Sequence, residues 1–140
     1  MPSFDDFTDV LLQASIFTPD FNFQNGRVLA LILTNWPEVF TNVIFAGDLP
    51  PGIPGEVPRI VVQSEDARLR VSVGPARLDI VWQSQKDGDR VDVNRHLDLC
   101  CDVFSRYVEN FLARIGRVGC VLSRTALVAD PAAELSRHFC

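Results

Sequence analysis

Residues 59–82 read RIVVQSEDARLRVSVGPARLDIVW, and their alternation decides the fold. Apolar side chains recur at every second position in three short runs that polar turn residues separate. A period of two is typical of strands in a half-buried antiparallel sheet. The stretch therefore predicts a three-stranded meander. Its buried face is formed by Ile60, Val62, Ser64, Ala67, Leu69, Val71, Val73, Leu78, Ile80 and Trp82.

Two turns set the predicted pairing of these strands. A turn centred on residues 65–66 would pair Val62 with Leu69. A turn through residues 74–75 would pair Leu69 with Ile80. Because a shift by one residue would bring charged side chains into the core, the alternation favours these pairings.

The opposite face of the meander is the candidate functional surface. It carries several arginines, which could bind an anionic ligand or an acidic partner, although a solvated face or a subunit contact is more common. Arg70 is predicted to lie opposite Asp79, an ion pair worth up to about 1 kcal/mol. Apolar residues on both faces indicate that a partner covers the second one. The candidate partner-binding residues are Arg59, Val61, Arg68, Arg70, Arg77, Asp79 and Val81.

Length and composition indicate one folded domain over residues 1–140, since 47% of the residues are hydrophobic and 22% are charged. The net charge of −5 argues against binding to nucleic acid or to an anionic membrane. There is no apolar run long enough to span a membrane. The first residues, MPSFDDFTD, lack the features of a signal peptide, so we expect a cytoplasmic protein.

The sequence offers no catalytic, cofactor-binding or metal-binding set. The four cysteines lack metal-ligand spacing and are interpreted as reduced thiols. His96 and Cys100 are four residues apart on a predicted helix and could share a metal, but no further ligand is nearby. A core thiol beside a surface histidine is the favoured interpretation. Phosphate-binding glycine patterns and a nucleophile elbow are absent.

A long amphipathic helix is predicted over residues 94–115, beginning near Asp92 or Asn94 and stopped by Gly116. Apolar residues recur at spacings of four and three, which is typical of a helix with one buried stripe. The stripe consists of Leu97, Cys101, Phe104, Val108, Phe111 and Ile115, widened by Cys100, Tyr107 and Leu112.

Residues 25–35 can form a helix or a hairpin. Good helix formers favour a helix, capped by Asn22 or Asn25 and ended by Pro37. The competing interpretation is a hairpin on the Asn25-Gly26 turn. The remaining elements are strands over 9–18, 38–46 and 117–129, a proline-rich loop over 47–58, and a helix that Asp130-Pro131 begins. Because that helix reaches the last residue, we expect a longer natural protein.

This order of elements resembles the N-terminal half of a family of uncharacterised bacterial proteins. The matching residues are Trp36-Pro37-Glu38, Arg68 to Trp82 and Arg117-Val118-Gly119. The resemblance implies a fold similar to that of the export chaperone SecB, with long helices on one face of an antiparallel sheet. A similar sheet around a helix occurs in hot-dog thioesterases, whose active-site pattern is not visible in this sequence.

We therefore predict an α+β protein with an antiparallel sheet of five or six strands and the helix over 94–115 packed on one face. The predicted function is a non-enzymatic oligomerising or protein-binding module, chaperone-like, without a cofactor. Its partners would be further copies of the chain or another protein or peptide. The alternative is a small-molecule-binding or hot-dog-like enzyme domain. It requires an enclosed pocket lined by polar groups such as Tyr107, Asp79 or His96.

Overall fold

The structure, a computed structural model, describes residues 7–19 and 22–139. In chain order the elements are β1 (Thr8–Phe17), α1 (Asn25–Asn35), β2 (Asn42–Ala46), β3 (Ile60–Gln63), β4 (Leu69–Gly74), β5 (Arg77–Gln83), α2 (Val93–Phe111), β6 (Arg117–Thr125) and α3 (Pro131–Phe139). Within these residues, six strands form one antiparallel sheet in the order β2-β3-β4-β5-β1-β6. The predicted α+β class is confirmed.

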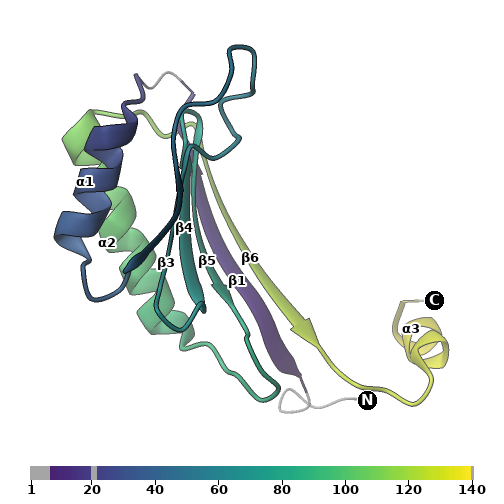
Figure 1. Cartoon of the computed structure of the whole chain (residues 1–140). Coiled ribbons are helices and arrows are strands. Elements are labelled where there is room, and N and C mark those ends of the chain that lie inside the picture. Colours follow the sequence, from purple (N-terminus) through teal and green to yellow (C-terminus); the bar gives the residue numbers. More distant parts are fainter. Residues whose placement is uncertain (1–6, 20–21, 140) are drawn as a thin grey trace.

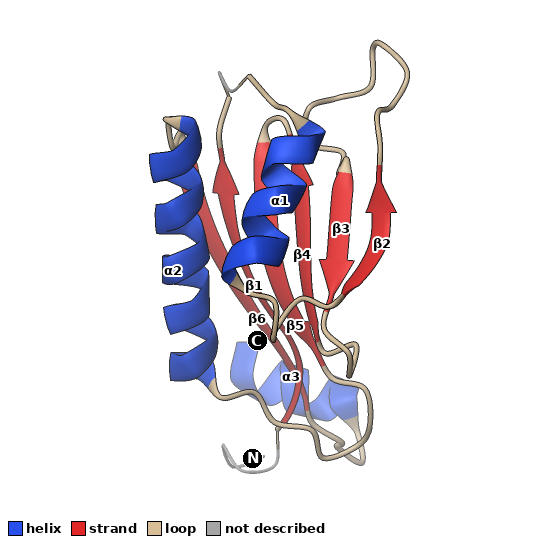
Figure 2. Ribbon diagram, turned by 60° about the vertical axis from the view of Figure 1, so that its left-hand side comes forward, coloured by secondary structure: helices blue, strands red, loops and turns tan. Residues whose placement is uncertain are grey.

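Helices α1 and α2 lie on the same face of the sheet, and α2 runs over β1 (Figures 1 and 2). The core lies between these two helices and the inner face of the sheet. Helix α3 stands apart from the sheet at the end of an extended segment (Figure 1). Fully buried apolar side chains of the core include Ile16, Val28, Phe40, Ile60, Val62, Val71, Val73, Leu78 and Ile80.

Strand β1 is an interior strand, next to the edge strand β6, although it comes first in the chain. It pairs with β5 on one side and with β6 on the other. Its alternation places Leu12 and Ile16 in the core and Gln13 and Ser15 on the outer face. The strand predicted over 9–18 is confirmed.

The two predicted hairpin registers are wrong by two residues. Val62 pairs with Val71 instead of Leu69, and Leu69 pairs with Trp82 instead of Ile80. A shift by two leaves every side chain on its predicted face, so the hydrophobic pattern cannot distinguish these pairings. Turn chemistry decides between them. Pro75 takes the first central position of its turn, which suits its fixed φ.

The observed register pairs the outer-face residues differently from the predicted register. Arg70 lies opposite Val81, and Asp79 lies opposite Ser72. The predicted cross-strand pair between Arg70 and Asp79 is therefore wrong. Its premise was the hairpin register that the turn at Pro75 excludes.

Helix α1 confirms the helical interpretation of residues 25–35 over the hairpin. The predicted asparagine cap is wrong, because Gln24 occupies the N-cap position and makes no side-chain cap bond. The C-terminal prediction is confirmed, since the helix ends before Trp36 and Pro37. The next turn continues to Phe40, whose N–H donates to the Trp36 carbonyl, so β2 begins at Asn42 and not at Glu38.

Helix α2 begins as predicted, because the side chain of Asp92 accepts a hydrogen bond from the N–H of Arg95. It ends at Phe111, earlier than predicted, and Leu112 adopts a left-handed conformation with φ 51°. The reason is that Gly116 N–H donates to the carbonyl of Phe17, so the chain must turn toward the sheet before Gly116.

Three further predictions concern the loop and the C-terminal part. The loop over 47–58 is confirmed and packs against the end of β4, where a Cβ at Gly74 would lie 2.7 Å from the carbonyl oxygens of Gly55 and Val57. Strand β6 ends at Thr125, four residues before its predicted end. Helix α3 begins as predicted, with Asp130 accepting a hydrogen bond from the N–H of Ala133.

Candidate functional site

The residues of α2 that are buried agree only in part with the predicted apolar stripe. The side chains of α2 that are buried under the helix are His96, Cys100, Val103 and Tyr107. Cys100 is a core thiol as predicted, whereas Cys101 is exposed and His96 is buried. The prediction of a surface histidine is therefore wrong. Cys140 lies outside the described residues.

One flank of α2 is held against α1. Trp36 Nε1 donates to Asp102 Oδ2 over 2.9 Å, and Arg106 Nη1 donates to Asn35 Oδ1 over 2.8 Å. The Arg106 guanidinium also lies 5.8 Å from the ring centroid of Trp36. These contacts place α1 on the side of α2 that carries Asp102 and Arg106.

The opposite flank of α2 is apolar and open. Successive helical residues are about 100° apart, so Leu97, Phe104 and Val108 lie on the far side of the buried stripe from Asp102 and Arg106. Cys101 is exposed on this flank, and Leu97, Phe104 and Val108 are partly exposed. Leu112, just after the helix, is 87% exposed. The structure therefore leaves this flank of the predicted stripe only partly covered, although Phe104 and Val108 also pack against the core.

Strand β6 continues this apolar area along the edge of the sheet. Val118, Cys120 and Leu122 pair with the inner-face residues of β1 and so share the face that the helices cover. Val118 is 64% and Leu122 is 42% exposed. We call the α2–β6 surface the set Leu97, Cys101, Phe104, Val108, Leu112, Val118, Cys120 and Leu122.

The two parts of this surface lie on the same face of the sheet. Strand β6 pairs with β1, over which α2 runs, so Cys120 lies on the side of the sheet that α2 covers. Burial, and to a smaller extent the neighbouring Cys101 and Cys120 thiols, raises the pKa of the Cys100 thiol to about 12. Sequence analysis missed this surface, although the width of the predicted stripe was a signal that one sheet contact could not bury it.

The predicted arginine row is not a free basic surface. The guanidinium of Arg59 donates to the carbonyl oxygens of Ile53, Pro54 and Val57 in the proline-rich loop. Arg77 donates to Asp79 over 2.9 Å. The guanidinium groups of these two arginines are therefore occupied by contacts within the chain.

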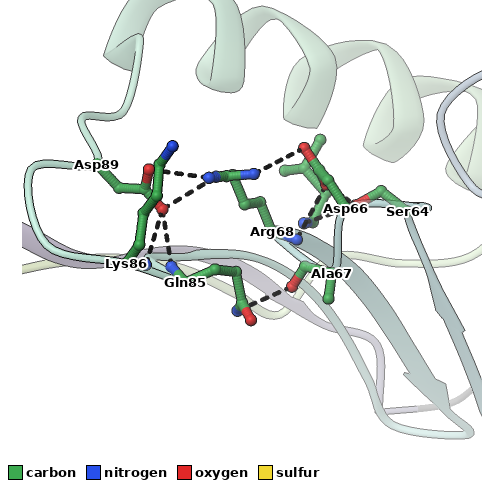
Figure 3. A network of polar contacts seen from close by, with 8 residues as sticks. Ser64, Asp66, Ala67, Arg68, Gln85, Lys86 and Asp89 are labelled. Atoms are coloured by element: carbon green, nitrogen blue, oxygen red, sulfur yellow. Dashed lines mark hydrogen bonds and ion pairs between the residues drawn. The ribbon is translucent and has the colours of Figure 1, made fainter.

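Arg68 lies in a polar network at the opposite end of the meander (Figure 3). It donates to both carboxylate oxygens of Asp89, over 2.9 and 3.0 Å, and contacts Asp66 at 3.4 Å. The hydrogen bonds from Arg68 and from the N–H groups of Gln85 and Lys86 lower the pKa of Asp89 to about 2. This network ties the loop over 84–90 to the turn over 64–68.

The rest of the predicted face is mixed. Val81 is 5% exposed, so its predicted exposure is wrong, since the Arg70 and Gln13 side chains flank it across the sheet. Val61 is half-buried. Arg70 is exposed and has no polar partner among the described residues. Binding of a partner to this face stays a prediction.

Asp79 organises a polar cluster in the middle of the outer face. It accepts hydrogen bonds from Ser15 Oγ, from Gln13 Nε2 over 3.1 Å and from Arg77 Nε. Ser15 is 6% exposed, and its hydroxyl donates to this carboxylate and accepts a hydrogen bond from Gln13 Nε2 over 3.2 Å. The cluster joins β1 to β5 and is structural in character.

A cavity of about 270 Å³ lies between the N-terminal part of α2 and the sheet. Its lining residues are Val39, Leu69, Trp82, Val91, Asp92, Arg95, His96 and Leu99. Of the three polar groups expected in a pocket, His96 lines this cavity. Tyr107 lies further along α2, and Asp79 points to the other face of the sheet.

His96 is expected to make stability depend on pH. Burial lowers the pKa of His96 below its usual 6.5, and neither ring nitrogen has a hydrogen-bond partner among the described residues. As the pH falls below 6.5, the unfolded chain takes up a proton that the folded chain resists. The free energy of unfolding therefore decreases, by at most about 1.4 kcal/mol per pH unit.

The matched variant for this prediction is His96→Leu, which removes the titration and leaves an apolar side chain. Urea denaturation between pH 8 and pH 5 is expected to show a smaller loss of stability in the variant than in the wild-type chain. Equal pH dependence in both would contradict a neutral buried His96.

Comparison with known proteins gives no relative from which a function could be transferred. No family model matches the chain, and neither a curated protein nor a solved structure does so. Among the residues that the structure describes, no three His, Cys, Asp or Glu side chains gather in a way that could hold a metal ion. None of the described helices is long and apolar enough to cross a membrane. The geometry alone therefore carries the functional argument.

Proposed function

We propose that the chain is a non-enzymatic protein-binding module that oligomerises and acts in a chaperone-like way. The α2–β6 surface is the observation that carries this proposal. It places apolar side chains of a helix flank next to apolar side chains of an edge strand, in the part of the chain that the structure describes. Large contiguous apolar patches on a protein surface usually mark sites of protein interaction.

The energetic argument is that this surface gains from being covered. Full burial of a valine or leucine side chain is worth about 1.5–3 kcal/mol. Burial of the exposed side chains against a partner would therefore contribute several kcal/mol of binding free energy. The side chains are those of Val118, Leu122 and Leu112. The proposal includes a SecB-like relationship, which the antiparallel sheet with α1 and α2 on one face supports. The unpaired thiols of Cys100, Cys101 and Cys120 fit the proposed cytoplasmic location.

A small-molecule-binding domain is the second candidate, and the cavity beside His96 favours it. Its volume of about 270 Å³ is near the lower end of ligand pockets, and its walls are mostly apolar. The ring nitrogens of His96 are buried and are not on the cavity surface, so they would not orient a ligand. We therefore rank this candidate below the protein-binding module.

The test of the proposed function is protection of an unfolding client protein from aggregation. The wild-type chain is expected to suppress light scattering by a heat-denatured client at near-stoichiometric amounts. Val118→Asp is expected to abolish most of this protection, because it places a charge in the α2–β6 surface. Ser123→Asp is the matched control, since it adds the same charge to the other face of β6. A wild-type chain that protects no client and stays at 15.6 kDa at all concentrations would overturn the proposal.

A further inference from the structure

The two edges of the sheet differ in how they are protected against pairing. Strand β2 is short, carries an irregularity between Val43 and Phe45, and leads into the proline-rich loop over 47–58. Short length, bulges and prolines are devices that prevent edge-to-edge pairing. Strand β6 has nine residues, no proline, and charges only at Arg117 and Arg124 near its ends. Its free edge is therefore open to another strand.

We propose that the strand that pairs with this free edge is β6 of a second copy of the chain, so that two chains form one continuous antiparallel sheet. The inference rests on the proposed function and names the partner of its surface. An antiparallel strand pair has two-fold symmetry, so a strand of this kind can be its own partner. Helix α2 of each copy then lies on the same face of the joint sheet.

The side chains of β6 select the register of this pairing. With the two-fold axis at Cys120, Val118 lies opposite Leu122 of the second copy, and the two Cys120 residues face each other. All inner-face pairs at the axis are then apolar or thiol. An axis at Val121 would instead place Val118 opposite Arg124, which is already bound to Asp9 over 2.7 Å. The axis at Cys120 is therefore favoured.

The same symmetry brings the open flanks of the two α2 helices toward each other. Each α2 lies over β1, one strand from the shared edge, and strands are about 4.8 Å apart. Phe104 and Val108 of both copies then project into the space above the paired β6 strands. The α2–β6 surfaces of the two copies therefore face each other across the shared edge of the joint sheet.

The arrangement also brings the C-terminal segment of one copy to the other. In this register Thr125 lies opposite Ile115 of the second copy, so α3 emerges beside the end of the other chain's α2. Ile115 is 47% and Leu112 is 87% exposed there. Leu135 on α3 is 59% exposed, and α3 lies away from its own sheet (Figure 1). In this register the segment after β6 leaves the joint sheet beside the exposed residues Leu112 and Ile115 of the other copy.

Cross-linking through Cys120 tests the register. The chain would carry Cys101→Ser and Cys140→Ser, which leaves Cys120 and the buried Cys100. A short bismaleimide is expected to convert most of the protein to a species of twice the chain mass of 15.6 kDa. In the matched control, Cys120→Ser with Ser123→Cys, the thiols would lie six residues out of register, roughly 20 Å apart, and cross-linking should fall at least tenfold.

Light scattering on the untreated protein separates this inference from the proposed function. A dimer with cross-linking selective for Cys120 supports the inference, whether or not clients are protected. A chain that stays at the monomer mass overturns it, and client protection by that monomer would leave the protein-binding part of the proposed function intact. A dimer that cross-links equally well at both positions overturns the register and with it the proposed pairing.

Discussion

Replacing Trp36 with alanine is expected to lower the free energy of unfolding by about 3–5 kcal/mol, the usual cost of truncating a buried aromatic side chain. Trp36 is 5% exposed and belongs to the core at the end of α1. Its indole N–H also donates to Asp102 of α2. One side chain thus contributes apolar burial and a link between two helices, so its removal leaves a cavity between them. Urea denaturation followed by circular dichroism measures the loss.

The matched variant Trp36→Phe separates the two contributions. Phenylalanine keeps most of the apolar volume but cannot donate to Asp102, whose side chain is 47% exposed and can bond to water instead. We therefore expect a loss of only about 1–2 kcal/mol. If both variants lost the same stability, the hydrogen bond and not the packing would dominate.

The sequence predicts which face of the sheet a side chain occupies better than it predicts which residue lies opposite on the next strand. The inner-face residues of β3, β4 and β5 lie on the predicted side, because a period of two separates the two faces of a strand. Ala67, predicted on the same face, lies instead in the turn before β4. The pairing depends on which residues form each turn. The left-handed conformation of Ala67, with φ 62°, is not visible in a hydrophobic pattern. The registers were therefore wrong by a shift that the pattern permits.

The prediction of which α2 side chains are buried was wrong for a different reason. Its apolar arc includes both the buried His96–Tyr107 side and the open Leu97–Val108 flank, and the sequence cannot tell which part meets the sheet. The contacts of Trp36 and Asn35 with α2 decide it, and these come from a helix distant in sequence. The C-terminal end of α2 likewise depends on the bond between Gly116 and Phe17.

The candidate site was the part least accessible to sequence analysis. Side chains that share a face were correctly grouped, but their partners were not. Arg59, Arg68 and Arg77 each bind an acceptor supplied by a loop, a turn or a neighbouring carboxylate. A pattern of period two shows where an arginine points and not what it reaches. The interaction surface instead emerged from exposure, which only the packed structure reveals.

Replacing Asp79 with alanine is expected to cost about 1–3 kcal/mol, because it removes the acceptor of the buried Ser15 hydroxyl and of two partly buried donors. Ser15 and Gln13 on β1 and Arg77 on β5 all donate to this carboxylate. The loss falls at the junction between β1 and β5, which links the last two strands of the sheet to the meander. Thermal and urea denaturation measure it, and Asp79→Asn, which keeps one acceptor oxygen, should retain part of the stability.

The matched control for this prediction is Arg70→Ala. In the predicted register Arg70 would have been the partner of Asp79, so both variants would lose the same ion pair. In the structure Arg70 is exposed and faces Val81, and its removal should change the free energy of unfolding by less than about 0.5 kcal/mol. Equal losses in Arg70→Ala and Asp79→Ala would restore the predicted register. A large loss in Asp79→Ala alone would instead show that Asp79 supports the sheet and leave Arg70 as the one arginine of this face, among the described residues, without a structural role.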